Sequence, residues 1–418
     1  MTVLIAGAGI AGLSLGLTLH QIGVPFRIFE AVREMRPLGV GINLQPNAVR
    51  ELLDLDLGAA LDDIGIPIKD YGFYSKRGLE IWTEKRGREA GYHWPQYAVH
   101  RGALQMRLAS ELRARAGENC IVTNAPAAGF KNTDQGAALV LQNGEEIHGD
   151  LVIAADGIHS ALRAQMYPNE GPAIWGGAIL WRGTTQAKPF LNGASMALAG
   201  HDTQRIVAYP ITPADPQTGQ ATINWIAELR VDPAQGWRKE DWNRAAQLDD
   251  FLPKFEDWTF DWLNVPELIK GAKQVFEYPM VDRDPVDQWT DGRVTLMGDA
   301  AHPTYPVGSN GASQAIVDAR ILGQMFLSHG VNQAALLAYE DLIRPRTRNV
   351  ILANRGSGPD AVMQKVEDLC GGQFETIDDV IPYADLKAHA DHYKVLAGFD
   401  VETLNATPQL IERGARIG

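Results

Sequence analysis

The first thirty residues combine two short apolar runs with one helical pattern. An apolar run over 2–6 enters a glycine turn at 7–12, a helical pattern covers 10–22 and ends at Gly23, and a second apolar run covers 26–29. Short runs of strand-forming residues on either side of a helix, with glycine at the breaks, are typical of a βαβ unit. The N-terminal pattern therefore predicts the start of a parallel sheet.

Later segments extend this prediction. The runs 150–155 and 294–297 are continuous and aliphatic and lead into Asp or Gly-Asp, as expected for parallel strands buried on both faces. The stretch 175–278 has apolar runs separated by turn residues and predicts an inserted antiparallel sheet. Amphipathic patterns predict helices over 312–328 and 333–355.

Composition and charge mainly argue against certain classes of protein. The chain has 418 residues, of which 45% are hydrophobic and 21% charged, and this predicts a globular protein of two domains. A net charge of -13 without a basic block argues against a nucleic-acid partner. Cys120 and Cys370 lie in no disulfide-rich or metal-binding spacing, so no metal site is expected. Without a signal peptide or a run of membrane length, we expect a cytoplasmic monomer or homodimer with no membrane partner.

The glycine turn has the spacing of a nucleotide-binding motif. Residues Gly7, Gly9 and Gly12 fit G-x-G-x-x-G, in which the glycines allow a tight turn, close approach of a pyrophosphate and close helix packing. Glu30 ends the second run, 18 residues after Gly12, where a carboxylate accepts ribose hydroxyls and repels a 2′-phosphate. The motif predicts FAD or NAD and does not separate the two, and a glycine turn that binds nothing is the alternative.

Two later segments resemble the class A flavoprotein aromatic hydroxylases, the family of p-hydroxybenzoate and salicylate hydroxylases. Residues 150–160, with Asp156 before Gly157, resemble the Asp-Gly motif that lies near the FAD pyrophosphate and the nicotinamide donor. Residues 292–303, with Asp299 after Gly298, resemble the Gly-Asp motif whose aspartate binds the ribityl chain. The alternative for each aspartate is an ordinary turn or cap residue.

The resemblance covers most of the chain and implies its fold class. That class is α/β, with an FAD-binding Rossmann-like domain of the glutathione-reductase type, an inserted antiparallel β-sheet substrate domain and C-terminal helices, as in the p-hydroxybenzoate hydroxylase-like fold. The implied division is an FAD-binding domain of residues 1–71, 97–172 and 280–355, a substrate-binding domain of 72–96 and 173–279, and a C-terminal helical segment of 356–418.

The same resemblance implies further contacts with FAD. The loop 303–312 aims backbone N–H groups at the N1–C2=O edge of the flavin, although Asn310-Gly311 reverses the family's usual order, so we transfer no side-chain role. Arg101 belongs to a segment that contacts the FAD phosphate or ribityl region, with a surface helix start as the alternative. The implied cofactor-binding residues are Gly7, Gly9, Ile10, Ala11, Gly12, Glu30, Ala31, Gly41, Arg101, Gln105, Asp156, Asp299, Gly308, Gly311 and Ala312.

Class A hydroxylases use NADH or NADPH to reduce FAD, and O2 then forms a C4a-hydroperoxide that hydroxylates an aromatic ring. Longer stretches such as 278–285 and 305–316 resemble the phenazine-hydroxylating members of the family. They imply a planar aromatic substrate, with a fused N-heterocycle and a carboxylate among the options. Salicylate, urate or quinolone hydroxylation, an epoxidation, an FAD oxidase or dehydrogenase without oxygen insertion, and a non-catalytic flavin sensor are the alternatives.

We expect the substrate pocket between the flavin and the inserted sheet. An arginine in it would pair with a substrate carboxylate. The candidate catalytic or pocket residues are Arg182, Tyr209 and Tyr305, together with Trp181 and Trp225, and packing in the core is the alternative for each. His302 fits a structural role as well as a catalytic one.

Overall fold

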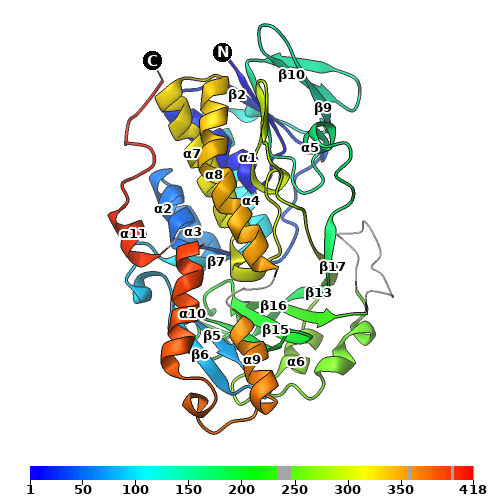
Figure 1. The fold of residues 1–418 in the computed structure, drawn as a ribbon, viewed down its shortest axis with the longest axis vertical. Coiled ribbons are helices and arrows are strands. Elements are labelled where there is room, and N and C mark those ends of the chain that lie inside the picture. The colour runs from blue at the N-terminus through cyan, green and yellow to red at the C-terminus, as the bar shows by residue number, and fades with distance from the viewer. Residues whose placement is uncertain (233–245, 356–359, 397–399, 418) are drawn as a thin grey trace.

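A six-stranded sheet forms the centre of the half of the molecule that carries both chain ends (Figure 1). Its strand order is β18-β19-β12-β1-β2-β8, and every neighbouring pair is parallel except β18 with β19. The strands are β1 Val3–Ala6, β2 Phe26–Phe29, β8 Ile121–Val122, β12 Leu151–Ala154, β18 Thr290–Asp291 and β19 Val294–Leu296. The parallel strands predicted from the apolar runs are therefore confirmed. Strands β1, β12 and β19 are fully buried, whereas β2 exposes Arg27.

The computed structural model describes residues 1–232, 246–355, 360–396 and 400–417. The predicted ranges 173–279 and 356–418 each include residues outside this part.

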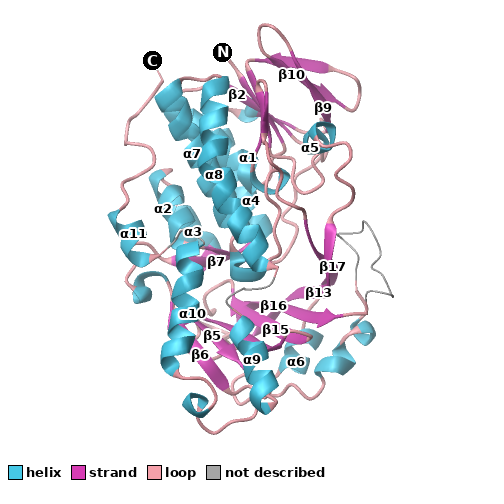
Figure 2. Ribbon diagram, in the orientation of Figure 1, coloured by secondary structure: helices cyan, strands magenta, loops and turns pink. Residues whose placement is uncertain are grey.

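Long helices pack beside the six-stranded sheet and on one another (Figures 1 and 2). Helix α1 contacts α4 and α7, and α7 also contacts α2 and α8. Gly23 ends α1 in the left-handed conformation, with φ 78°. The helices are α1 Ile10–Ile22, α2 Pro46–Asp54, α3 Gly58–Ile64, α4 Arg101–Ala116, α5 Ala161–Met166, α6 Val265–Lys270, α7 Gly311–His329, α8 Gln333–Asn354, α9 Ala361–Cys370, α10 Tyr383–Leu396 and α11 Val401–Ala406. The helices predicted over 10–22, 312–328 and 333–355 are confirmed as α1, α7 and α8.

A seven-stranded sheet lies at the opposite end of the molecule from the chain termini, where Figure 2 shows its strands in magenta. Its order is β17-β13-β16-β15-β14-β5-β6. The strands are β5 Asp70–Tyr74, β6 Glu80–Lys85, β13 Ile174–Ala187, β14 Ser195–His201, β15 Gln204–Pro210, β16 Ala221–Arg230 and β17 Val275–Asp282. The strands of 175–278 pair with one another only antiparallel, as predicted, and β5, which comes from outside this stretch, adds to β14 in parallel. These two strands are not joined by a hairpin, which would have forced them antiparallel.

Two three-stranded sheets complete the strands of the described residues. One has the order β3-β7-β4 and the other β11-β10-β9. The strands are β3 Gly41–Leu44, β4 Gly65–Ile68, β7 Gln96–His100, β9 Ala127–Asn132, β10 Ala137–Leu141 and β11 Glu146–Gly149. Strand β3 matters for the site, because it carries Gly41 and Asn43 between the two large sheets.

Helices α9 and α10 lie beside the seven-stranded sheet (Figure 1). Helix α9 packs on β14, and its buried residues Val362, Met363 and Val366 join an apolar cluster with Phe73 and Leu198 of the sheet. The last described residues return to the other half, where the Ile417 N–H donates to the Ile22 carbonyl oxygen at 2.9 Å. Within the described residues, no helix is long and apolar enough to cross a membrane.

Candidate functional site

One cavity of about 340 Å³ is lined by residues of both halves of the molecule. The predicted cofactor residues that line it are Gly9, Ile10, Ala11, Gly41, Arg101, Asp299, Gly308, Gly311 and Ala312. The predicted pocket residues Arg182, Tyr209 and Tyr305 line the same cavity. The structure therefore brings together residues that are far apart in the sequence.

The glycine turn opens toward this cavity at one position. A Cβ atom added to Gly7 would lie 2.5 Å from the Ala155 carbonyl oxygen, and one added to Gly12 would lie 2.0 Å from the Gly7 carbonyl oxygen. A Cβ atom on Gly9 would meet no atom within 4 Å. Gly7 and Gly12 are thus required by the fold, whereas Gly9 leaves open space in front of the N-terminus of α1.

Two predicted residues bind the turn from the side. Glu30 accepts a hydrogen bond from the Ala8 N–H at 2.7 Å, and Gln105 donates one to the Ala8 carbonyl oxygen at 2.8 Å. Their side chains stand next to the position where the motif expects the adenosine. Ala31 follows Glu30 and is exposed.

Asp299 stands at the carboxyl end of β19 and faces the cavity. Its side chain is accessible to solvent because it lines the cavity, and protein surrounds that cavity. Burial raises the pKa of Asp299, while the nearby His302 and Arg101 oppose this rise. A carboxylate at the carboxyl end of a parallel strand is in the position where open α/β sheets bind ligands.

His302 follows Asp299 in the same segment and links that segment to α7. Its Nε2 atom lies 2.5 Å from an Asp318 carboxylate oxygen on α7, and the same oxygen accepts the Gly298 N–H at 3.1 Å. Burial acts to lower the pKa of His302, but the Asp318 carboxylate outweighs it and the net pKa is raised. His302 therefore holds the segment that carries Asp299, and the structure favours its structural role.

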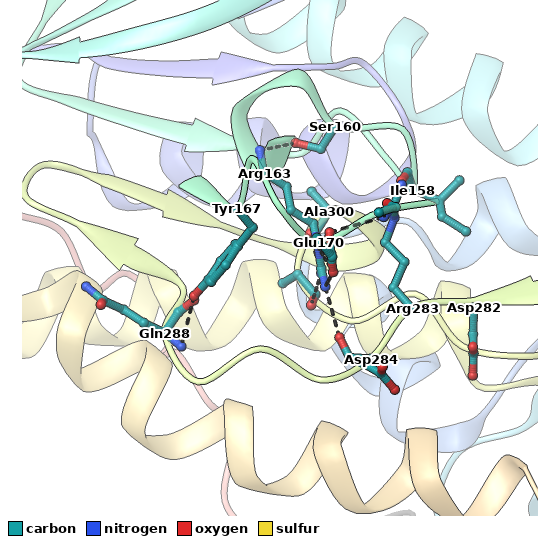
Figure 3. Close-up of polar contacts among 12 residues, drawn as sticks. Ile158, Ser160, Arg163, Tyr167, Glu170, Asp282, Arg283, Asp284, Gln288 and Ala300 are labelled. Atoms are coloured by element: carbon teal, nitrogen blue, oxygen red, sulfur yellow. Dashed lines mark hydrogen bonds and ion pairs between the residues drawn. The ribbon is translucent and has the colours of Figure 1, made fainter. Parts of the chain in front are cut away.

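Arg163 also holds the segment that carries Asp299, through hydrogen bonds to its backbone (Figure 3). This guanidinium is fully buried and donates to the carbonyl oxygens of Ala300 at 3.0 Å and Ala301 at 2.7 Å. It also forms an ion pair with Glu170 at 2.5 Å, and Arg283 reaches the other oxygen of that carboxylate at 3.1 Å. The two segments that resemble family motifs are thus held to each other by buried hydrogen bonds.

Asp156 does not line the cavity itself, although its neighbours Ala155 and Gly157 do. One carboxylate oxygen accepts the Ala161 N–H at 2.9 Å, next to the cap that Ser160 forms on α5. Burial raises the pKa of Asp156, and its other oxygen is buried with no partner among the described residues. One oxygen of Asp156 therefore caps the start of α5, and the other remains available to accept a hydrogen bond.

The loop before α7 turns its backbone in an unusual way. Gly308 has φ 71° and Ser309 has φ 55°, in the left-handed region that non-glycine residues rarely adopt. Gln45 holds the loop by donating to the Gly308 carbonyl oxygen at 3.3 Å. A Cβ atom on Gly311 would meet nothing within 4 Å, so the start of α7 faces open space.

These features fit FAD. The open space in front of Gly9, Gly157 and Gly311 is a cradle that a backbone-binding cofactor can occupy. The Asn43 amide lines the same cavity and is buried, yet neither of its polar atoms has a partner among the described residues. Buried polar groups without partners are costly, so a polar ligand at this position is the physical explanation.

The floor of the cavity is one face of the seven-stranded sheet. Successive side chains on a strand point to opposite faces, and Arg182 of β13, Tyr209 of β15 and Ile226 of β16 line the cavity. Trp181 and Trp225 therefore point away, into an apolar cluster where Trp181 stacks on Phe251 at 4.8 Å. The expectation that these two tryptophans line the pocket is wrong.

Arg182 is a half-buried positive charge on this floor. One amino group donates to the Gly41 carbonyl oxygen at 3.1 Å, and the guanidinium lies 5.7 Å from the Tyr278 ring. Tyr209 contacts it, and burial raises the pKa of Tyr209 to about 12. No carboxylate of the described residues forms an ion pair with Arg182, its Nε is unpartnered, and burial lowers its pKa. An anionic group would satisfy this cation.

Sequence reasoning missed several residues of the site. They are Asn43, Tyr71, Arg163, Arg205, Glu228 and Asp360. The alternation along β15 and β16 was a usable signal, because Arg205 and Tyr209 are four residues apart and must share a face. No local signal existed for Asp360, which reaches the cavity through packing of the C-terminal helices.

Comparisons with known proteins agree with this geometry. A family model described as FAD binding domain matches residues 1–353. The chain is 42% identical over 362 residues to phenazine 1,6-dicarboxylic acid hydroxylase PhzS of Lysobacter antibioticus, covering 84% of this chain and 89% of that protein. It is 31% identical over 345 residues to aurachin C monooxygenase/isomerase of Stigmatella aurantiaca, covering 81% and 84%.

Solved structures share the fold. Klebsiella pneumoniae HpxO complexed with FAD and uric acid has a TM-score of 0.73 at 23% identity, over 98% of this chain and 97% of that chain. This likeness confirms the predicted fold class, in which an FAD-binding domain is combined with a second sheet.

Proposed function

Because the chain belongs to the FAD-binding-domain family, we propose that it hydroxylates a planar, fused N-heteroaromatic compound that carries a carboxylate. FAD is its cofactor, and its reaction class is monooxygenation of an aromatic ring. NADH or NADPH and O2 are the co-substrates typical of this class. The substrate and the residues that bind it are the new part of the proposal.

The observation that carries the proposal is that both sets of predicted residues line the same cavity. Residues suited to FAD, including Gly9 and Asp299, line one part of it, and Arg182 and Tyr209 line its floor. A substrate bound to Arg182 would therefore share one enclosed space with the cofactor. Such proximity and orientation contribute strongly to the rate of a bimolecular step.

Aliphatic side chains surround the charged group on the floor. They are Leu180, Met196, Leu198, Val207, Ile226 and Met280. An apolar surface of this kind suits the faces of a flat aromatic system, and Arg182 suits a carboxylate on its edge. The relative from Lysobacter, whose name gives a phenazine dicarboxylic acid as substrate, supports a fused ring system.

The chemistry that FAD would supply here is transfer of one oxygen atom of O2 to the ring, while the other is reduced to water with electrons from NADH or NADPH. The protein contributes binding and exclusion of water. Arg182 would fix the carboxylate, and Tyr209 would fix Arg182. Tyr305 is buried in an apolar cluster with Leu180 and Met280 and would close the cavity beside the loop before α7.

The other cofactor contacts and the division of the chain stay proposals. We propose that Glu30 and Gln105 contact the adenosine end, Asp299 the ribityl chain and the loop before α7 the flavin ring. We propose the domain ranges given from the sequence, with β5, β7 and β17 running across the boundaries at 71/72, 96/97 and 279/280. We also propose a cytoplasmic monomer or homodimer.

The test is turnover of a substrate panel by the FAD-loaded enzyme. The panel contains phenazine-1-carboxylate, salicylate, urate and a quinolone, each with NADH and with NADPH, in the presence of labelled O2. We expect phenazine-1-carboxylate to stimulate oxidation of the nicotinamide most and to yield labelled product. Oxidation that gives only hydrogen peroxide and unlabelled product would support an oxidase, and strongest stimulation by urate or salicylate would contradict the proposed substrate.

A further inference from the structure

The cavity has a second charged group on its floor, built from three residues. Arg205 of β15 and Glu228 of β16 are opposite each other in the sheet, and the guanidinium contacts the carboxylate at 2.7 and 2.8 Å. Asp360, which precedes α9, forms an ion pair with another nitrogen of the same guanidinium. All three residues line the cavity.

The charges of this group do not cancel. One guanidinium stands between two carboxylates, so the group carries one excess negative charge when all three are ionised. Burial acts to lower the pKa of Arg205, but Glu228 and Asp360 outweigh it and raise that pKa. Burial raises the pKa of Tyr71, which lines the cavity nearby, and Asp360 raises it further. Arg205 is thus fully engaged and cannot serve a substrate anion.

The two charged groups of the floor differ in this respect. Arg182 has no carboxylate partner among the described residues, whereas Arg205 has two. Arg205 lies two strands across from Arg182 and, through the register, two residues along. Strand spacing then puts their Cα atoms roughly 12 Å apart, with the aliphatic side chains between and around them. A flat substrate can therefore meet a positive group at one end and a negative group at the other.

We infer that Glu228 and Asp360 are specificity-determining residues that exclude a second carboxylate, so that this enzyme accepts an aromatic monocarboxylate and discriminates against the corresponding dicarboxylate. The inference rests on the proposed function, because it assumes that Arg182 takes the first carboxylate. An acid group at the far end would meet like charge in a site of low dielectric, which is unfavourable. A neutral or hydrogen-bond-donating edge would be accepted there.

The same arrangement gives the C-terminal segment a role. Asp360 reaches the cavity because the apolar residues of α9 fix this helix on the sheet. A separate ion pair of α9, Glu367 with Lys76 at 2.5 Å, does not line the cavity. Gln364 of α9 also accepts the Asp202 N–H at 3.0 Å. The C-terminal segment therefore places Asp360, just before α9, in the wall of the cavity and adds one of its charges.

The experiment compares phenazine-1-carboxylate with phenazine-1,6-dicarboxylate on the FAD-loaded full chain. Dissociation constants come from the perturbation of the flavin absorbance, and kcat/KM comes from stimulated oxidation of NADH or NADPH. We expect the wild type to prefer the monocarboxylate by about tenfold or more in both measurements. Asp360→Asn and Glu228→Gln remove one negative charge each without changing shape, and each should reduce that preference by about tenfold.

Glu367→Gln is the matched control, because it breaks an ion pair of α9 that does not line the cavity. It should leave the preference unchanged, so an equal effect of Glu367→Gln and Asp360→Asn would mean that α9 packing, and not charge, sets the preference. Equal or tighter binding of the dicarboxylate by the wild type, or an unchanged ratio in both charge variants, would overturn the inference while leaving the proposed function intact. If neither compound binds or stimulates oxidation, the proposed function and the inference both fail.

Discussion

The two parts of the cavity are built in different ways. The part suited to FAD is made largely of backbone, with glycines at the turn before α1 and at the loop before α7. The floor is made of side chains that alternate along strands of the seven-stranded sheet. A backbone site tolerates few changes of residue, because an added Cβ atom fills it, whereas a side-chain site can change its preference by single substitutions. We therefore expect substitutions to change the substrate preference of this protein more readily than its choice of cofactor.

The largest expected effect is at the glycine turn, where a methyl group is added to one of two glycines in separate variants. In Gly12→Ala the added Cβ would lie 2.0 Å from the Gly7 carbonyl oxygen, so we expect a loss of more than about 3 kcal/mol in the free energy of unfolding. In Gly9→Ala the added Cβ meets nothing within 4 Å, so the apoprotein should keep its melting temperature while FAD binds about tenfold more weakly. Thermal unfolding and FAD titration of both variants measure this, and an equal effect on stability would contradict it.

The next largest effect is expected at Arg163, which supports the cofactor site with a side chain. Arg163→Met leaves Glu170 with Arg283 alone and removes the donors of two buried carbonyl oxygens. Breaking a buried pair of this kind costs about 3–5 kcal/mol, and FAD affinity should fall with it. Tyr167→Phe, which removes one hydroxyl and its two hydrogen bonds with the Gln288 backbone in the same region, is the control and should cost about 1–2 kcal/mol (Figure 3). Urea unfolding of the two variants gives the comparison, and wild-type stability in Arg163→Met would refute it.

A smaller effect, limited to the floor, is expected at Arg182. Arg182→Gln removes the charge that would bind the carboxylate, so KM for a carboxylated substrate should rise by about thirtyfold, or ~2 kcal/mol. A carboxylate-free analogue should lose much less, and Trp181→Phe on the other face of the same strand should leave KM unchanged. Steady-state kinetics with both substrates decide this. Equal losses for both substrates would show that Arg182 does not recognise the carboxylate.

The smallest effect concerns His302 and pH. Its pKa is raised in the folded protein, because Asp318 outweighs the effect of burial. The stabilisation from its charge is therefore complete below the unfolded pKa of about 6.5 and is lost as the pH rises through the folded pKa. The stability difference between wild type and His302→Gln should accordingly be largest in acid and decline toward alkaline pH. Urea unfolding between about pH 6 and pH 9 follows it, and a difference that grew with pH would contradict the assignment.

The two parts of the cavity also differ in how far the sequence predicts them. Gly7, Gly9 and Gly12 were predicted because spacing within one turn determines what each glycine does. Trp181 and Trp225 were misplaced because both faces of their strands are buried, so the apolar run does not tell which set of alternating residues faces the cavity.

The charged group on the floor depends on long-range pairing. Arg205 meets Glu228 through the register of β15 with β16, and it meets Asp360 across 155 residues of sequence. The sequence around each of the three residues gives no signal that predicts these contacts. Individual strands and helices were predictable from their own patterns and the fold class from the family resemblance, but the specificity of the site emerges only when the elements are assembled.

The position of β19 has a consequence for how the protein is made. This strand pairs with β12, which pairs with β1, so three segments separated by long stretches of chain must meet in one sheet. During synthesis the N-terminal βαβ unit leaves the ribosome first and must wait for residue 296 before its sheet gains this strand. The FAD contact proposed for Asp299 can therefore form only late in synthesis, and before then the incomplete sheet is the kind of partly folded species that chaperones protect.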